Sequence, residues 1–116
     1  SIGYCDRHRY MTEETTIIIG GTCYDCNLSS LTFDDVSVTI SERQNEILQI
    51  LVGQKGRMVA RDYILEHVWG DVSYANSMAL NVQINYLRKL LSPDDSIVIE
   101  TLHKRGYVLK VKAIPD

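Results

Sequence analysis

Three cysteines and a histidine in the first 26 residues have the spacing of a zinc site. Cys5 and His8 form a C-x2-H pair, and Cys23 and Cys26 form a C-x2-C pair after fourteen intervening residues. Thiolate sulfur and imidazole nitrogen are ligands that Zn²⁺ prefers, and four of them complete a tetrahedral structural site. The same residues also fit reduced thiols or a Cys23–Cys26 disulfide. We favour the thiol and disulfide interpretations and predict no metal or other cofactor.

A second group with recognisable chemistry is a basic stretch near the C-terminus. Residues 101–112 hold four of the twelve Lys and Arg and no acid, although the net charge of the chain is −3. Acids outnumber bases by eight to four over residues 1–56, whereas bases outnumber acids by eight to seven over residues 57–116. If the fold gathers these bases, they form a positive patch that attracts phosphate.

Enzymatic chemistry finds no support in the sequence. A glycine-rich phosphate loop, a nucleophile elbow and the His-Glu-x-x-His motif of metalloproteases are all missing. The three histidines, His8, His67 and His103, fall on different predicted elements. The acidic pocket of a receiver domain is missing too, so the chain is not expected to accept a phosphoryl group. We therefore predict a protein that is not an enzyme.

The length and composition indicate one globular domain. A chain of 116 residues with 45% hydrophobic and 23% charged residues is long enough to bury a core. No apolar run approaches the roughly 18 residues of a membrane span, and the pattern of a signal peptide is missing, so we expect a cytoplasmic domain. We divide the chain into an N-terminal extension, 1–15, a folded domain, 16–112, and a C-terminal tail, 113–116.

The elements that must position these residues begin with four short predicted strands. Each strand is rich in β-branched or aromatic residues, and Gly, Asn or Asp residues separate them. They cover residues 16–20, 22–25, 30–33 and 36–40. Strands joined by such short turns are predicted to form a small antiparallel sheet.

Two predicted helices follow this sheet. Ser41 and Gln44 form a capping box at the start of the first helix, which runs to about Val52. A glycine-containing turn leads to the second helix, residues 61–69. Ala60 stands where a Ser or Thr cap is usual, which costs about 1 kcal/mol of capping.

The third predicted helix, residues 75–91, is the most informative element. Its apolar stripe recurs at i, i+4, i+7 and i+11 and consists of Leu80, Ile84, Leu87 and Leu91. The opposite face carries Met78, Val82, Asn85, Tyr86 and Lys89, with Gln83 and Arg88 on its flanks. The first stripe is therefore predicted to be core, and the second face is available for binding.

A hairpin with a basic tip ends the domain. Strands are predicted over residues 97–102 and 107–111, on either side of His103-Lys104-Arg105-Gly106. A sheet, three helices and a hairpin in this order make an α+β fold, the winged helix-turn-helix. In that fold the third helix enters the major groove of DNA, and the hairpin tip, or wing, reaches the adjacent backbone or minor groove.

Three motifs carry a resemblance to a known family. They are Val-Trp-Gly at 68–70, Asn-Val-Gln-Ile-Asn-Tyr-Leu-Arg-Lys-Leu-Leu at 81–91 and Ile-Glu-Thr-Leu-His-Lys-Arg-Gly-Tyr at 99–107. Together with the N-terminal sheet they resemble the OmpR/PhoB-type DNA-binding domain of bacterial transcription regulators. The Lys-Arg-Gly-Tyr hairpin most resembles the ToxR/CadC branch, whose domains are often joined to a membrane span rather than to a phosphorylated receiver. The resemblance implies double-stranded DNA as partner and, in that branch, a membrane tether outside this chain.

The resemblance also implies which residues meet the partners. The recognition helix contributes Met78, Val82, Gln83, Asn85, Tyr86, Arg88 and Lys89. The wing contributes Thr101, His103, Lys104 and Arg105. A loop that in some members touches RNA polymerase corresponds to Asp71, Val72, Ser73 and Tyr74. The family has no metal in its N-terminal sheet, which argues against zinc in this chain.

Two departures from the family pattern bear on affinity. Members with strong DNA contacts often carry Arg where this chain has Asn85 and Tyr86. Asn or Gln can still read adenine, and Val82 can meet a thymine methyl group, so A·T-biased recognition is expected. With about 3 to 5 phosphate contacts, binding to one site should be weak and salt-sensitive. A homodimer on DNA would strengthen it.

Other roles stay open for part of this surface. Lys110 and Lys112 alternate along a strand, where lysine also guards an exposed edge. Arg88 and Lys89 near a helix end complement its dipole. The competing function is a winged-helix module that binds protein through the apolar outer face of the third helix.

Overall fold

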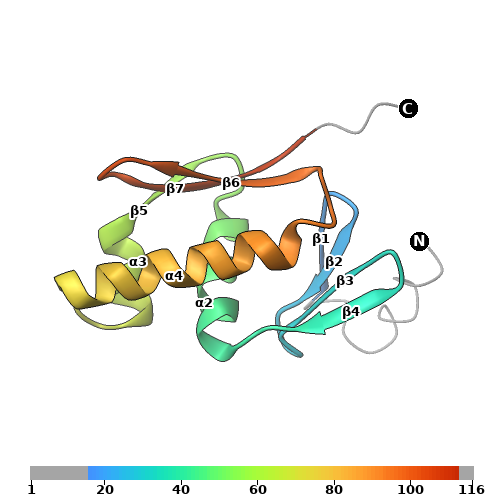
Figure 1. Cartoon of the computed structure of the whole chain (residues 1–116), viewed down its shortest axis with the longest axis horizontal. Coiled ribbons are helices and arrows are strands. Elements are labelled where there is room, and N and C mark those ends of the chain that lie inside the picture. Colours follow the sequence, from blue (N-terminus) through green and yellow to red (C-terminus); the bar gives the residue numbers. More distant parts are fainter. Residues whose placement is uncertain (1–15, 113–116) are drawn as a thin grey trace.

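The structure of residues 16–112, a computed structural model, contains three helices and two antiparallel sheets (Figure 1). Residues 1–15 and 113–116 lie outside the described part of the chain. In chain order the elements are β1 (Thr16–Ile19), β2 (Thr22–Asp25), β3 (Ser30–Phe33), β4 (Val36–Thr39), α2 (Glu42–Gly53), β5 (Met58–Ala60), α3 (Arg61–Val68), α4 (Tyr74–Leu91), β6 (Ile97–Leu102) and β7 (Gly106–Val111). The predicted α+β winged helix-turn-helix is confirmed.

The first sheet is a meander in the order β1-β2-β3-β4. Strands β2 and β3 have their predicted bounds, and β1 and β4 each end one residue earlier than predicted. The turn between β3 and β4 consists of Asp34 and Asp35, both with positive φ, which suits a tight hairpin between twisted strands. The sheet contributes Ile19, Tyr24 and Leu31 to the core.

Helix α2 begins at the predicted capping box. The N–H of Gln44 donates to Oγ of Ser41 at 3.1 Å, and the N–H of Ser41 donates to Oε1 of Gln44 at 2.9 Å. These bonds satisfy donors that the first turn of a helix otherwise leaves unpaired. Helix α3 has no such cap, because Ala60 makes no side-chain hydrogen bond to it, as the sequence analysis predicted.

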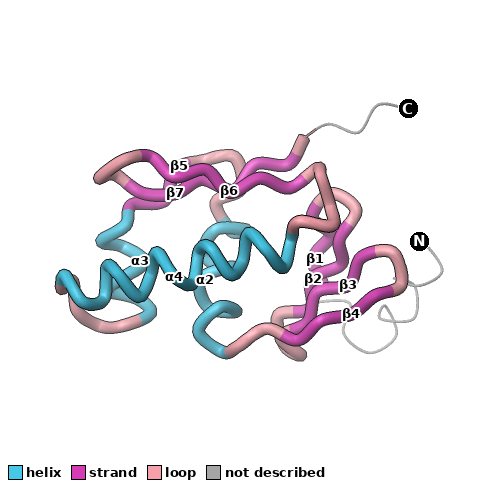
Figure 2. The backbone as a smooth tube through the Cα atoms, viewed as in Figure 1, coloured by secondary structure: helices cyan, strands magenta, loops and turns pink. Residues whose placement is uncertain are grey.

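Helix α4 runs along the length of the domain, next to both sheets (Figures 1 and 2). It begins at Tyr74, one residue before the predicted start, where Oγ of Ser73 accepts a hydrogen bond from the N–H of Asn76 at 3.1 Å. The buried stripe is the predicted one and consists of Leu80, Ile84, Leu87 and Leu91. Since this stripe packs into the core, the opposite face of α4 is left for solvent or a partner.

The second sheet has three strands in the order β5-β7-β6, where the sequence analysis expected a two-stranded hairpin. Strand β5 was not predicted, since no element was assigned to the residues between the glycine-containing turn and α3. Its three residues are too few for a periodic pattern, and β5 forms because it pairs with β7, with Val59 opposite Tyr107. A Cβ on Gly106 would lie 2.0 Å from the carbonyl oxygen of Val59, so only glycine permits this approach.

A buried carboxylate joins the first sheet to the loop after α4. Asp94 accepts hydrogen bonds from the N–H of Gly21 and the hydroxyl of Thr22, both at 2.8 Å, and from the N–H and hydroxyl of Ser96 at 3.0 and 2.5 Å. Burial alone would raise the pKa of Asp94, but these hydrogen bonds stabilise the carboxylate and hold the pKa below its ordinary value. The carboxylate of Asp94 therefore holds the β1–β2 turn and the start of β2 against the loop after α4.

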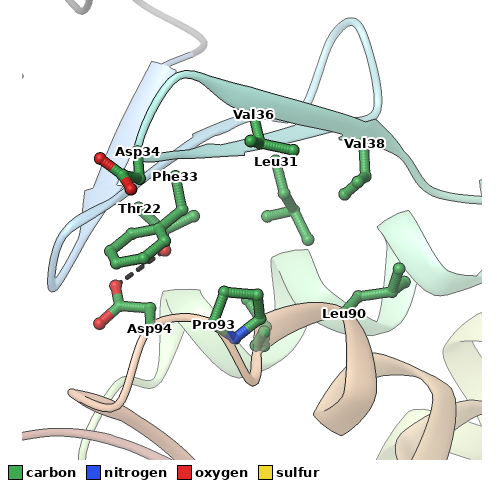
Figure 3. A pocket seen from close by; sticks show the side chains of 10 residues that line it. Thr22, Leu31, Phe33, Asp34, Val36, Val38, Leu90, Pro93 and Asp94 are labelled. Atoms are coloured by element: carbon green, nitrogen blue, oxygen red, sulfur yellow. Dashed lines mark hydrogen bonds between the residues drawn. The ribbon is translucent and has the colours of Figure 1, made fainter.

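An apolar groove of about 370 Å³ lies beside this link. Figure 3 shows Phe33 and Val38 of the sheet facing Leu90 and Pro93 at the end of α4, with the Thr22–Asp94 hydrogen bond at one end of the groove. The groove thus separates the β3–β4 hairpin from the C-terminal end of α4.

Candidate nucleic-acid interface

Helix α4 and the β6–β7 hairpin lie alongside each other, with β6 packed against the helix (Figure 1). The hairpin follows α4 toward the helix N-terminus, and its tip lies at the end of the domain far from the first sheet (Figure 2). We call residues 102–106 the wing. The outward side chains of α4 and of the wing are therefore available to the same partner.

The outer face of α4 carries an exposed apolar stripe. Tyr74, Met78, Val82 and Tyr86 are spaced four residues apart and are 81%, 51%, 50% and 51% exposed, so they lie along one side of the helix. Lys89 is exposed as well. Met78, Val82 and Tyr86 are where the sequence analysis placed them, and Tyr74 lengthens the stripe. Contiguous exposed apolar side chains mark an interaction surface.

Arg88 ties α4 to β6. Its Nε donates to the carbonyl oxygen of Ile99 at 2.9 Å, its Nη2 to Oγ1 of Thr101 at 2.6 Å, and its Nη1 to Oδ1 of Asn85 at 3.1 Å. From the family resemblance, Arg88, Asn85 and Thr101 are expected to meet DNA. The structure brings the three together, but in bonds with one another. This guanidinium therefore fixes the position of β6, the strand that leads to the wing, relative to α4.

A second link joins α4 to β7. The phenol of Tyr107 donates to Oδ1 of Asn81 at 2.5 Å. Burial raises the pKa of Tyr107, while the nearby guanidinium groups of Arg61 and Arg88 oppose that rise. The phenol thus stays protonated at neutral pH and keeps donating its hydrogen bond.

The wing is a tight turn that displays its bases. The N–H of Arg105 donates to the carbonyl oxygen of Leu102 at 2.9 Å, and Lys104 takes a left-handed conformation with a φ of 60°. The side chains of His103, Lys104 and Arg105 are exposed. Two permanent positive charges and a histidine therefore stand at the tip of the hairpin, as predicted.

The other bases of the C-terminal stretch are placed differently. Nζ of Lys110 lies 2.5 Å from Oε1 of Glu100 on the neighbouring strand, so its charge is balanced. The N–H of Lys112 donates to the carbonyl oxygen of Ser96 at 2.7 Å, at the end of the hairpin away from the wing. Of the four bases in residues 101–112, only Lys104 and Arg105 stand in the wing.

The remaining candidates occupy the edges of this surface. Gln83 is half-buried on the flank of α4, and its buried Oε1 accepts no hydrogen bond from the described residues. In the loop before α4, Asp71 and Val72 are exposed, whereas Ser73 caps the helix. Tyr74 is the first residue of α4 rather than a loop residue, and its side chain extends the apolar stripe.

A polar hollow of about 290 Å³ lies beneath the wing. Its wall includes Arg61, Asn81, Thr101, Lys104, Arg105 and Tyr107. No role was predicted for Arg61, Asn81 or Tyr107. Asn81 and Tyr107 stand inside the family motifs, which was a usable signal, whereas Arg61 follows the strand β5 that the sequence did not reveal.

The candidate zinc ligands do not assemble in the described part of the chain. Cys5 and His8 lie outside residues 16–112, and within that range no group of three or more His, Cys, Asp or Glu side chains is arranged to hold a metal. Cys26 is a thiol and not half of a disulfide, so the Cys23–Cys26 bond considered from the sequence is not formed. Within the same range no helix is both long and apolar enough to cross a bilayer.

Comparison with known proteins shows which family this domain resembles. The family model described as "Transcriptional regulatory protein, C terminal" matches residues 35–109. The chain is 32% identical over 97 residues to the transcriptional regulatory protein RprY of Bacteroides fragilis (strain YCH46), which covers 84% of this chain and 41% of RprY. The chain spans less than half the length of the first curated relatives it matches.

Solved structures share the fold. The DNA-binding domain of CadC from E. coli matches with a TM-score of 0.72 at 24% identity, over 84% of this chain and 92% of that one. The RstA DNA-binding domain of Klebsiella pneumoniae, solved in complex with the RstA box, matches with a TM-score of 0.69 at 24% identity, over 82% and 96% of the two chains. With the family model matching residues 35–109, this chain belongs to the OmpR/PhoB-type family of C-terminal domains of transcriptional regulatory proteins.

Proposed function

We propose that this domain binds double-stranded DNA, with α4 in the major groove and the wing on the adjacent backbone or minor groove. The observation that carries this proposal is the exposure of Lys104 and Arg105 in the wing, alongside the outward face of α4. An α-helix fits the width of the major groove, and exposed bases beside it suit phosphate. The RstA domain, which shares the fold, was solved with its DNA box.

Base preference follows from the chemistry of the outer face of α4. Met78 and Val82 are exposed and apolar, which suits contact with thymine methyl groups, while hydrogen-bonding groups on this face are few. Asn85 already accepts a bond from Arg88, so its amide nitrogen remains as a donor. We infer a preference for A·T-rich sites, which selection from a pool of random duplexes would measure.

Replacing both wing bases tests the proposal. We expect Lys104→Ala with Arg105→Ala to weaken binding to a duplex at low salt and to lower the slope of log K against log[salt] by about 2, close to 0.9 per phosphate. Lys55→Ala with Arg57→Ala is the matched control, because both bases are exposed on the turn before β5 and outside the surface. Fluorescence anisotropy over a salt series measures both pairs. Unchanged affinity and slope in the wing variant would overturn the DNA proposal.

The apolar stripe favours protein binding as a second candidate function. Tyr74 and Tyr86 lie at its two ends, each at least half exposed, and such a stripe suits an apolar groove or helix of a partner. Tyr86→Ala distinguishes the two functions. Loss of a protein complex with full retention of the duplex would support the interaction module, whereas loss of the duplex supports DNA readout.

Further partners belong to the same proposal. Asp71 and Val72 are exposed in the loop before α4, and this loop stays accessible to RNA polymerase when α4 lies in the groove.

A homodimer on tandem half-sites would compensate for the small number of basic side chains by adding a second set of contacts. We propose a cytoplasmic domain, with any membrane tether outside this chain. Half-site spacing from the same duplex selection would reveal the dimer.

A further inference from the structure

The hollow beneath the wing gathers positive charge and hydrogen-bond donors. Arg61, Lys104 and Arg105 line it together with Thr101 and Tyr107, and none of the described residues that line it is acidic. It is formed where three elements meet, because α3 begins at Arg61, the wing closes at Arg105, and α4 passes alongside. The N–H of Arg61 donates to the carbonyl oxygen of Arg105 at 3.0 Å, which fixes the start of α3 against the wing.

Arg61 has unused hydrogen-bonding capacity at this place. Its Nε is buried and donates no hydrogen bond to the described residues. The nearest carboxylate oxygen, Oδ1 of Asp62, lies 3.9 Å from that Nε, which is too far for a hydrogen bond. Buried donors in folded proteins are nearly always satisfied, by water or a ligand where the protein offers nothing. A guanidinium in this state suits an anion with several oxygen acceptors.

The neighbouring bases differ from Arg61 in a useful way. The guanidinium of Arg88 donates hydrogen bonds to Ile99, Thr101 and Asn85. Lys110 forms an ion pair with Glu100. Arg61, the first residue of α3, differs from both because the N–H group of its Nε, close to the wing, donates no hydrogen bond to the described residues. Burial raises the pKa of Tyr107, and Arg61 is the first of two guanidinium groups that oppose this rise, which agrees with a position beside the phenol.

We propose that this hollow binds one phosphate of the DNA backbone, with Arg61 as its deepest ligand and Lys104 and Arg105 closing over it from the wing. The inference rests on the proposed function and adds to it a contact from the first residue of α3. The interface then extends from α4 and the wing to the start of the preceding helix. Because the contact is to phosphate, it adds affinity without sequence preference.

Removing the charge of Arg61 tests the site. We expect Arg61→Gln to weaken duplex binding by a similar factor for all sequences and to lower the slope of log K against log[salt] by about 0.9. Arg61→Lys keeps the charge and should keep the slope. Arg57→Gln is the matched control, because Arg57 is exposed before β5 and does not line the hollow. Each variant is first checked for a thermal unfolding transition like that of the parent.

A spectroscopic measurement on the unchanged protein covers the case in which Arg61→Gln does not fold. The Nε–Hε resonance of Arg61, assigned by its loss in Arg61→Lys, should shift when duplex is added, and the corresponding resonance of Arg57 should not. If the parent binds duplex with a salt-dependent affinity while this resonance stays still or Arg61→Gln keeps the parent slope, the phosphate site is wrong and the proposed function stands. If the parent does not bind duplex at all, both are wrong.

Discussion

The first sheet lies near the C-terminal end of α4, whereas the second sheet runs along the helix (Figure 1). Each sheet is fastened by a charged side chain, and the two charges are opposite. The first sheet is held by Asp94, whose carboxylate accepts four hydrogen bonds across the β1–β2 turn and the loop after α4. The second sheet is held by Arg88, whose guanidinium donates three bonds to β6 and to its own helix. Each link uses an ion with its hydrogen bonds satisfied, which makes a partly buried charge tolerable.

The tips of the two sheets differ in the same way. The β3–β4 turn carries Asp34 and Asp35, and the wing carries Lys104 and Arg105, all of them exposed. Both turns contain residues with positive φ. Their backbones therefore turn in a similar way, while the charges of their side chains are opposite. An acidic tip is repelled by a phosphate backbone and a basic one is attracted. The reversed charge thus agrees with the proposed function, in which the wing contacts DNA and the β3–β4 turn does not.

Gly106→Ala should have the largest effect, because Gly106 is the first residue of β7, the middle strand of the second sheet. The added Cβ would lie 2.0 Å from the carbonyl oxygen of Val59, and backbone cannot move aside without breaking the pairing of β5 with β7. We expect a loss of about 3 kcal/mol in the free energy of unfolding, measured by urea denaturation. Gly53→Ala, with nothing within 4 Å of the added atom, should change stability by less than about 0.5 kcal/mol. Equal effects would refute the close approach.

Asp94→Asn should detach the first sheet and leave the wing intact. One carboxylate oxygen accepts from Gly21 and Thr22 and the other accepts from Ser96, so an amide, whose N–H₂ replaces one of the two oxygens, loses one of these sets of bonds. We expect a loss of about 2 kcal/mol in the free energy of unfolding at pH 7. Because the folded pKa of Asp94 lies below its unfolded value, the contribution is complete above about pH 4 and is lost as the pH falls through the folded pKa.

Urea denaturation from pH 7 down to pH 3 measures this difference. The parent protein should lose stability toward low pH more steeply than Asp94→Asn, so that the two curves converge. Asp95→Asn, at the exposed neighbouring position, should run parallel to the parent. Parallel curves for Asp94→Asn and the parent would contradict the role of the charge.

Arg88→Met should loosen β6, and with it the wing, from α4. We expect a smaller loss in the free energy of unfolding, about 1 to 2 kcal/mol, because the Arg88 side chain is only half-buried. Hydrogen exchange at the amide of Thr101 should speed up more than exchange in β2 of the first sheet. Lys89→Met is the control, since it removes an adjacent exposed charge without breaking the link to β6. If exchange at Thr101 is unchanged in Arg88→Met, the guanidinium does not position the wing.

Ala60→Ser should have the smallest effect and a favourable one. A serine hydroxyl at this N-cap can accept a bond from the first turn of α3, where Ala60 provides none, and we expect a gain of about 1 kcal/mol. Ala75→Ser places the same hydroxyl inside the first turn of α4, where no gain is expected. Thermal denaturation compares the two, and a gain at both positions would argue against capping as the cause.

Much of the fold could be read from short stretches of sequence. The capping box of Ser41 and Gln44, the buried stripe of α4 and the hairpin around Gly106 were all predicted, because each depends on residues a few positions apart. The site could be read less completely. Its exposed members, Met78, Val82, Tyr86 and the wing bases, were found by helical spacing and charge, but the partners of Arg88 and Asn85 were not.

The sequence by itself determined the order of the elements other than β5, the buried face of α4 and the basic wing, since periodicity, caps and turns are local properties of the chain. Only the tertiary structure decided that Met58–Ala60 form a strand, that Arg88 joins α4 to β6, and that Arg61 lies beneath the wing. Each of these depends on groups far apart in the chain, such as Val59 opposite Tyr107. No local pattern encodes such a pairing, because the free energy that stabilises it comes from the partner.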